Sequence, residues 1–258
     1  MKILFIADII GQPGREAVAK VLPELRQREQ AELVIANGEN AAGGMGLTPH
    51  IARDLCKLGV DIITLGNHTW DKKEIMEIIE DENIIRPANY PPGVPGRGAA
   101  LVSTAGNFRV GVINLVGRVF MHPNDCPFRA VDKLITEMKK ETSLIIVDMH
   151  AEATSEKIAM GWYLDGKVSA VIGTHTHVQT ADERILPEGT AYITDVGMTG
   201  PQESVIGIKK EIILQRFLLG MPVRFEVAAG DLTFNGVALD IDEKTGKALA
   251  IKRIQLKA

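Results

Sequence analysis

The sequence contains little cysteine: only Cys56 and Cys126 occur among 258 residues. They form no C-x-x-C motif, so a cysteine-based metal knot and a scaffold of several disulfide bonds are both excluded. A chain that does not depend on disulfide bonds fits a reducing environment. We therefore expect a cytoplasmic protein.

A long basic run is also missing, and the formal net charge is −4 at pH 7. Proteins that coat nucleic acids neutralise many phosphates with lysine and arginine, so we expect no extended nucleic-acid surface. No apolar stretch approaches the ~20 residues that a membrane-spanning helix needs. The first apolar run is short and is interrupted by Asp8, so we predict neither a membrane segment nor a targeting segment.

Several common catalytic loops are absent as well. The chain has no G-x-S-x-G motif, which argues against a serine hydrolase with a nucleophile elbow. It has no Walker A motif, and no G-x-G-x-x-G motif follows an expected strand. The usual loops for nucleoside triphosphates and for dinucleotides are therefore excluded.

What the chain does contain is an ordinary globular composition, with 45% hydrophobic and 24% charged residues. Short apolar runs alternate with amphipathic stretches, which is typical of an α/β fold with helices on the faces of a sheet. No linker or repeat interrupts this pattern, so we predict a single domain over residues 1–258. We expect strands at 2–8, 31–40, 60–68, 99–104, 108–117, 143–150, 168–177 and 190–197, and helices at 14–29, 48–59, 71–83, 127–141 and 154–166.

Two regions depart from this alternation. The segment 99–117 reads as two strands that form a hairpin with its turn at 105–107. From Pro222 onward, apolar and polar residues alternate one by one, which is the pattern of antiparallel strands. The predicted fold is thus a β-sheet core flanked by helices, with antiparallel strands at the C-terminal end.

Five of the expected strands end in side chains that can bind metals. If these strands are parallel, their carboxyl ends lie along one edge of the sheet, where α/β proteins bind ligands. One such residue alone is more often a cap or a turn residue, but five strand ends of the same kind indicate a metal site. The candidates are Asp8, Glu39, Asn40, Asn67, His68, His150, His175 and His177.

This set of side chains narrows the chemistry. It contains no thiolate, and imidazole, carboxylate and amide ligands suit Fe, Mn, Zn, Co or Mg. Eight candidates are too many for one ion, whereas two ions about 3.5–4 Å apart that share a carboxylate fit well. Such a pair activates a bridging water and holds a phosphoryl group during in-line attack.

The motifs GNH at 66–68, His150 and THTH at 174–177 resemble those of the calcineurin-like metallophosphoesterases. The first motif departs from that superfamily because Ile10 stands where a histidine is usual, and Glu39 replaces the usual aspartate of the second motif. The longer pattern ADIIGQPGR, NGENAAGG, GNHTWD, DMHAEATSEK and GTHTHVQTAD resembles the YmdB-like branch over most of the chain.

The resemblance implies a phosphodiesterase with two metal ions that acts on small phosphodiesters, cyclic nucleotides of the 2′,3′ or 3′,5′ type. Fe and Mn are the favoured metals, and Zn, Co and Mg are also compatible. His68 is implied to be the proton donor or a stabiliser of the transition state. One ion would take Asp8, Glu39, Asn40 and His177, and the other would take Glu39, Asn67, His150 and His175.

Two other functions stay open: a phosphomonoesterase with the same metals, and a regulatory protein whose metal site turns over little substrate. The oligomeric state is open too, a homo-oligomer included. The glycine-rich segment 40–49 reads equally well as a mobile rim of the site and as a tight connector. Three minor expectations are that His50 lies on a helix surface, that His122 lies in a loop, and that Thr154 or Ser155 caps a helix.

Overall fold

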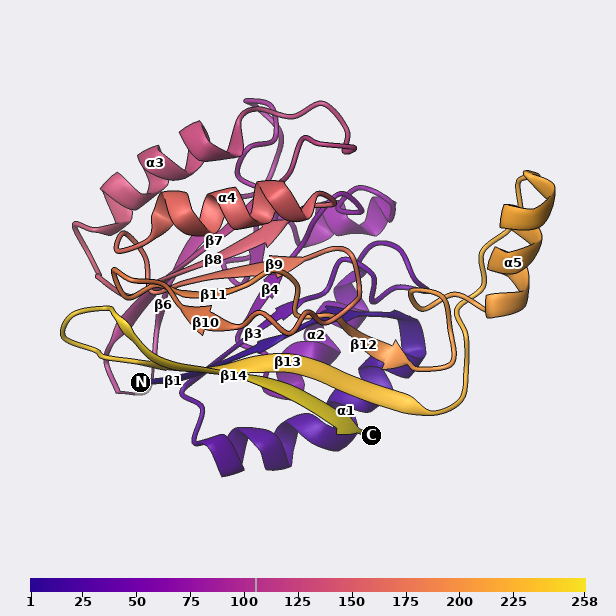
Figure 1. The fold of residues 1–258 in the computed structure, drawn as a ribbon, viewed down its shortest axis with the longest axis horizontal. Coiled ribbons are helices and arrows are strands. Elements are labelled where there is room, and N and C mark those ends of the chain that lie inside the picture. The colour runs from indigo at the N-terminus through magenta and orange to yellow at the C-terminus, as the bar shows by residue number, and fades with distance from the viewer. Residues whose placement is uncertain (105) are drawn as a thin grey trace.

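The computed structural model describes residues 1–104 and 106–258. Two β-sheets pack face to face, and helices cover the outer face of each sheet (Figure 1). Three groups of buried apolar side chains fill the spaces between these four layers. The predicted class, a β-sheet core flanked by helices with antiparallel strands at the C-terminal end, is confirmed.

The first sheet is built around a parallel core. Strands β1, β3, β4 and β5 are parallel neighbours, and β13 lies antiparallel between β1 and β14. Strand β12 joins β13 and also pairs with the short β2. The bounds are β1 Lys2–Ile6, β2 Asp8–Ile9, β3 Leu33–Asn37, β4 Ile62–Thr64, β5 Ile84–Ile85, β12 Met198–Pro201, β13 Leu232–Ile241 and β14 Ala248–Lys257.

The second sheet has the strand order β10-β11-β9-β8-β7-β6. Its four central strands are parallel, while the two edge strands run antiparallel to their neighbours. The predicted hairpin is confirmed by the pairing of β6 with β7, although position 105 of its turn lies outside the described residues. The bounds are β6 Ala99–Ser103, β7 Arg109–Val116, β8 Ile145–His150, β9 Ala170–Thr174, β10 Arg184–Ile185 and β11 Ala191–Ile193.

The helices mostly follow the predicted segments. Helices α1 and α2 pack on the first sheet, and α3 and α4 pack on the second. The bounds are α1 Gly11–Glu29, α2 Pro49–Lys57, α3 Pro127–Met138, α4 Thr154–Leu164 and α5 Lys210–Leu219.

The continuous apolar runs become strands that are buried on both faces. Successive side chains of a strand point to opposite sides. Accordingly, Ile3 and Phe5 join the group between the two sheets, whereas Leu4 and Ile6 pack toward α1 and α2. Burial on both faces is typical of parallel strands covered by helices, and it holds the strand ends in fixed places.

Two helix predictions are wrong. The segment 71–83 forms only a 3₁₀ helix, Lys73–Glu77. Its β-branched residues Ile75, Ile78 and Ile79 are all buried, and branching at Cβ lowers helix propensity. Helix α4 already begins at Thr154, so the N-cap is Ala153 rather than Thr154 or Ser155.

The C-terminal prediction is correct for β13 and β14 but too broad. Residues 222–231 form no strand, and an isolated bridge pairs Ile208 with Val227 of this segment. An alternating pattern becomes a strand only where a neighbouring strand is in reach. The unpredicted α5 projects away from the rest of the molecule (Figure 1), and Ile213 is its one buried residue.

Within residues 1–104 and 106–258, no helix is long and apolar enough to cross a membrane. The organisation of residues 1–258 as one domain stays a prediction.

Candidate metal centre

Parallel pairing places the carboxyl ends of β1, β3 and β4 at one edge of the first sheet and those of β8 and β9 at one edge of the second. Contacts of His150 with Glu39 and Asn67 bring the two edges together. Each strand end delivers its polar residues to these edges, where the two sheets approach each other. We call the seven predicted ligands the donor wall. It consists of Asp8, Glu39, Asn40, Asn67, His150, His175 and His177.

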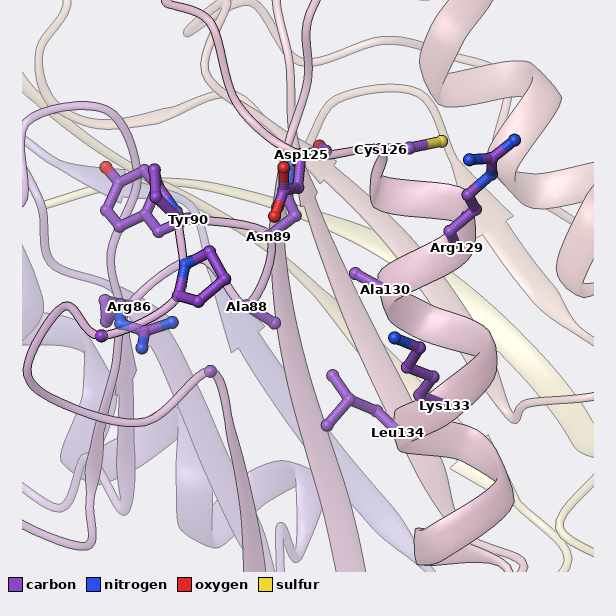
Figure 2. A pocket seen from close by; sticks show the side chains of 14 residues that line it. Arg86, Ala88, Asn89, Tyr90, Asp125, Cys126, Arg129, Ala130, Lys133 and Leu134 are labelled. Atoms are coloured by element: carbon purple, nitrogen blue, oxygen red, sulfur yellow. Dashed lines mark hydrogen bonds between the residues drawn. The ribbon is translucent and has the colours of Figure 1, made fainter.

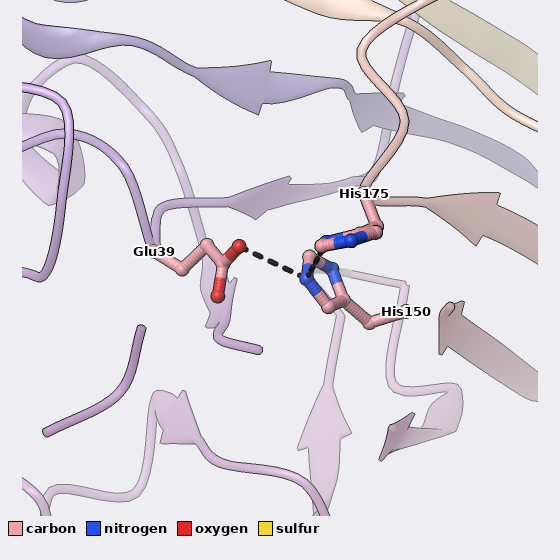
Figure 3. Close-up of side chains that lie close together, drawn as sticks. All are labelled: Glu39, His150 and His175. Carbon is pink, nitrogen blue, oxygen red and sulfur yellow. Dashed lines mark hydrogen bonds and ion pairs between the residues drawn. The ribbon is translucent and has the colours of Figure 1, made fainter. Parts of the chain in front are cut away.

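One part of the donor wall is centred on His150, a fully buried side chain. Its Nε2 lies 2.9 Å from Oε1 of Glu39, 3.0 Å from Nδ1 of His175 and 3.0 Å from Oδ1 of Asn67 (Figure 3). A single ring nitrogen cannot donate to three partners. Because several lone pairs converge here, Glu39, His150 and His175 form a group that could hold a metal ion.

The other part lies around His177. Its Nε2 is 3.3 Å from Nδ2 of Asn40 and 3.4 Å from Oδ2 of Asp8. Asn40 also lies 3.3 Å from Oε1 of Glu39, so Glu39 stands between the two parts. These two groups have the same members as the two predicted ligand sets. The assignment of each residue as a ligand stays a prediction.

Asp8 tests whether the donor wall fits a cation. Its carboxylate is fully buried, and Oδ1 has no hydrogen-bond partner, whereas Oδ2 accepts the backbone N–H of His175 at 2.9 Å. Burial raises the pKa of Asp8 well above its usual value. A buried carboxylate oxygen without a partner is costly, and a metal ion would supply the missing contact. The residues therefore fit a bound metal.

The pKa values of His150 and His175, the two histidines of the first group, differ sharply. Burial alone lowers the pKa of His150, but the charge and hydrogen bond of Glu39 outweigh it and raise the value to about 9. The same pair lowers the pKa of Glu39 to about 2, against the effect of burial. Burial and the neighbouring His150 lower the pKa of His175 to about 3. Without an ion, one proton therefore occupies the place where a cation would bind.

The ring of His150 is oriented by a relay that the sequence prediction missed. Its Nδ1 lies 2.9 Å from Oγ1 of Thr174, and this hydroxyl donates to Oδ1 of Asp148 at 2.7 Å. Because the hydroxyl proton points to Asp148, the Thr174 oxygen accepts from Nδ1–H, so it is Nε2 that would lose its proton and offer a lone pair to a metal ion. Asp148 could have been singled out from the sequence, because it is an acidic residue inside the apolar run IIVDMH.

A buried ion pair supports the segment 174–177. His175 and His177 have φ values of +98° and +65°, a region that L-residues rarely adopt. Oδ2 of Asp195 accepts from both the N–H and the hydroxyl of Thr176, at 3.0 and 2.7 Å. Nζ of Lys157 donates to Asp195 at 2.8 Å and to the carbonyl of Thr174 at 3.1 Å. This pair holds both histidines in an otherwise unfavourable backbone conformation.

His68 lies beside the donor wall without joining either group. Its backbone N–H donates to Oε2 of Glu39 at 2.9 Å, and its Nδ1 lies 2.7 Å from Oδ2 of Asp71. The side chain lines the same cavity as Glu39 and His175. Asp71, which orients the ring, was not among the predicted site residues, although it follows His68 by three positions.

This cavity has a volume of about 340 Å³ and two unlike sides. Glu39, Asn40, His175 and His177 belong to the donor wall. The apolar side chains of its lining, which we call the apolar wall, are Ile10, Met45, Ile206, Ile208 and Phe225.

The glycine-rich segment 40–49 has features of both readings. Gly43, Gly44 and Met45 line the cavity, whereas Ala42 and Gly46 close a tight turn through a 3.0 Å backbone hydrogen bond. Gly43, Gly44 and Gly46 have positive φ values, which glycine adopts without strain. The segment is thus a connector that also forms the rim of the site.

The remaining histidines lie elsewhere. His50 is on the exposed surface of α2 and pairs with Asp54 at 3.2 Å, as predicted. His122 lies in an exposed loop and is not among the residues that line the cavity. A separate cavity of about 570 Å³ lies between the segment 86–93 and α3 (Figure 2). Arg86 there donates to four backbone carbonyls, so its role is structural.

Residues 4–254 of the chain match the family model described as YmdB-like protein. The chain belongs to the YmdB-like family. A relative from Bacillus subtilis (strain 168), named 2′,3′-cyclic-nucleotide 2′-phosphodiesterase, is 55% identical over 255 residues, which are 98% of this chain and 96% of the relative.

Solved structures agree with this assignment to the YmdB-like family. A chain described as a hypothetical protein from Thermus thermophilus has a TM-score of 0.94 and 47% identity, covering 100% of this chain and 99% of that one. A chain described as a novel phosphatase from Mycoplasma pneumoniae has a TM-score of 0.94 and 37% identity, with coverages of 100% and 93%. The predicted family and the predicted metallophosphoesterase-like fold are both confirmed.

Proposed function

We propose that this protein is a metal-dependent phosphodiesterase that hydrolyses small cyclic nucleotides, with the 2′,3′-cyclic type as the principal substrate. The observation that carries the proposal is the convergence of Glu39, His150, His175 and Asn67 on one point beside an open cavity. The name of the 55% identical Bacillus subtilis relative supports the substrate type. A phosphodiester is small enough for this cavity, and no extended surface is needed.

Two divalent metal ions belong to this proposal, with Fe or Mn favoured over Zn, Co or Mg. Asp8, Glu39, Asn40 and His177 would hold one ion, and Glu39, Asn67, His150 and His175 the other. When bound, such ions polarise phosphoryl oxygens and lower the pKa of water. Since the ligands carry only two carboxylates, the loaded site would keep a positive charge that attracts an anionic substrate.

The chain's own residues would do the remaining work. His68 lines the cavity and belongs to neither ligand group, which supports a role as the proton donor to the leaving oxygen. Asp71 fixes the ring through Nδ1. Thr174 orients His150 through its hydroxyl, and Glu39 stands between the two ligand groups.

A second candidate is a phosphomonoesterase with the same metals. The description of the Mycoplasma pneumoniae structure as a phosphatase favours it. A regulatory protein with little turnover is the third reading from the sequence. The cytoplasmic setting also stays part of the proposal, supported by the two free cysteines.

The test is to load the purified protein with Mn²⁺ or Fe²⁺, measure metal content, and compare hydrolysis of 2′,3′-cyclic and 3′,5′-cyclic nucleotides with that of p-nitrophenyl phosphate. We expect turnover of the 2′,3′-cyclic substrate and release of a 3′-nucleotide. Faster turnover of the monoester would favour the phosphatase. A fully loaded protein that hydrolyses none of them would favour the regulatory reading.

A further inference from the structure

We infer that the apolar wall of the catalytic cavity is a binding subsite for the planar base of one nucleotide, with Phe225 as its main contact. This inference rests on the proposed function and adds the part of the substrate that the metal site does not recognise. It also names the segment that selects the substrate, residues 205–209 and 224–228 together with the rim at 43–45.

Several large apolar side chains of the apolar wall are exposed to solvent. Met45 is 42% exposed, Ile206 is 52% exposed and Phe225 is 37% exposed. All three line the cavity that also contains His175 and His177. Single exposed apolar residues are common, whereas a group of them around a cavity marks a ligand site.

The apolar wall is fixed to the donor wall by the chain itself. Nδ1 of His177 lies 3.0 Å from the backbone carbonyl of Ile206. The two segments that carry the wall pair with each other through Lys209 N–H to the carbonyl of Glu226 at 3.0 Å and Ala228 N–H to the carbonyl of Gly207 at 2.9 Å. Isoleucine side chains and Phe225 are thereby held at a set distance from the place of the phosphate.

The shape and chemistry select the ligand. The phosphodiester anion would bind at the donor wall. The part of the substrate attached to the phosphate would then contact the apolar wall, so it must tolerate an apolar surface. A nucleobase does so through its flat face, because every base stacks on an aromatic side chain. The volume of about 340 Å³ lies at the lower end of small-molecule sites, which suits one nucleotide and not a chain of several.

Phe225 combines a cation–π contact with a partly exposed side chain. The guanidinium of Arg216 lies 5.0 Å from the centre of its ring, which restrains the ring, while 37% of Phe225 remains exposed. Phe217 provides a matched control. It lies on the neighbouring α5, is 81% exposed and is absent from the cavity lining.

The experiment compares a nucleoside 2′,3′-cyclic phosphate with ribose 2,3-cyclic phosphate, which lacks the base, in the metal-loaded full chain. Phe225→Ala should lower the ratio of the two kcat/KM values about tenfold, the size of one stacked base. Met45→Ala, also in the apolar wall, should lower it by a smaller factor. Phe217→Ala should leave the ratio unchanged.

A binding measurement keeps this inference separate from the proposed activity. Calorimetry with 3′-AMP and with ribose 3-phosphate should show that Phe225→Ala weakens the nucleotide about tenfold more than the base-free ligand. If the wild type hydrolyses no cyclic nucleotide, the proposed function fails, but this measurement still decides the subsite. Equal losses for both ligands, or no loss for either, would overturn the subsite.

Discussion

The two walls of the catalytic cavity are built in opposite ways. Every residue of the donor wall lies at the carboxyl end of a strand of the four-layer core or within three positions after it, and relays such as Thr174–Asp148 and Lys157–Asp195 lie behind it. Apart from Ile10, the apolar wall is carried by a turn of glycines and by two paired segments at the base of α5, a helix with one buried residue. The residues proposed to perform the chemistry thus lie at strand ends, whereas most of those proposed to select the ligand lie on loops.

This difference between the walls leads to a general expectation. Changes in the donor wall should alter metal content or the chemical step for every substrate. Changes in the apolar wall should alter only the preference among substrates. Each of the following measurements tests whether the two walls affect different properties in this way.

The largest effect should come from His68. In His68→Ala, the chemical step should slow roughly 10²–10⁴-fold for a nucleoside leaving group, because a positioned proton donor contributes about that much. The loss should shrink for p-nitrophenyl esters, whose leaving group needs no proton. Rates on both substrates and metal content are measured together, with the exposed His50→Ala as the control. Loss of metal in His68→Ala would show that His68 is a metal ligand and belongs to the donor wall.

Glu39→Gln should follow, with an activity loss of about 10²-fold on all substrates. The side chain stands between both ligand groups, so a neutral amide should weaken both metal positions. Anomalous scattering and metal analysis report the two occupancies. Glu24→Gln, on the outer side of α1, is a suitable control. A folded Glu39→Gln protein with full turnover would contradict the shared-ligand role.

Thr174→Val should lower metal affinity about 10–100-fold, the usual cost of removing a group that orients a metal-binding histidine. Valine keeps the shape of threonine but cannot accept from Nδ1 of His150. A chelator competition titration measures the change, and Thr136→Val on the exposed face of α3 is the control. If the metal affinity is unchanged while the ring of His150 stays in place, the hydrogen bond from His150 to Thr174 does not contribute to metal binding.

The smallest expected effect per step is a pH dependence of metal uptake, about tenfold per pH unit. The pKa of His150 without metal is about 9, so below pH 9 a proton must leave before Nε2 can bind an ion. Each proton displaced makes affinity rise about tenfold per pH unit. His175, with a pKa of about 3, adds nothing near neutrality. Titrations between pH 6 and 8 should therefore show at least one proton released, and a flat profile would contradict this.

Much of the fold was predictable because burial on both faces leaves a clear mark in the sequence. Runs such as KILFIAD and SLIIVDMH read directly as parallel strands, and their polar ends identify one edge of the sheet. The 71–83 segment was misread because helical spacing of its isoleucines looks the same in a 3₁₀ turn. Helix α5 was not foreseen, since it has no buried face to produce a periodic pattern.

The candidate site was predictable only where chemistry is repeated at strand ends. Lys157 and Asp195 are 38 positions apart, and nothing local distinguishes them from surface residues until the fold brings them together. The apolar wall was missed for a similar reason. Phe225 and Met45 meet at one cavity, yet each reads alone as an ordinary loop residue.

Gly66 has a consequence for the history of this family. A Cβ atom at this position would collide with the carboxylate of Glu39 and with the ring of His150. The missing side chain therefore sets how closely the end of β4 can approach the metal-binding groups. A relative that carries any other residue at this position should have lost its metals, which gives a way to recognise inactive descendants from sequence alone.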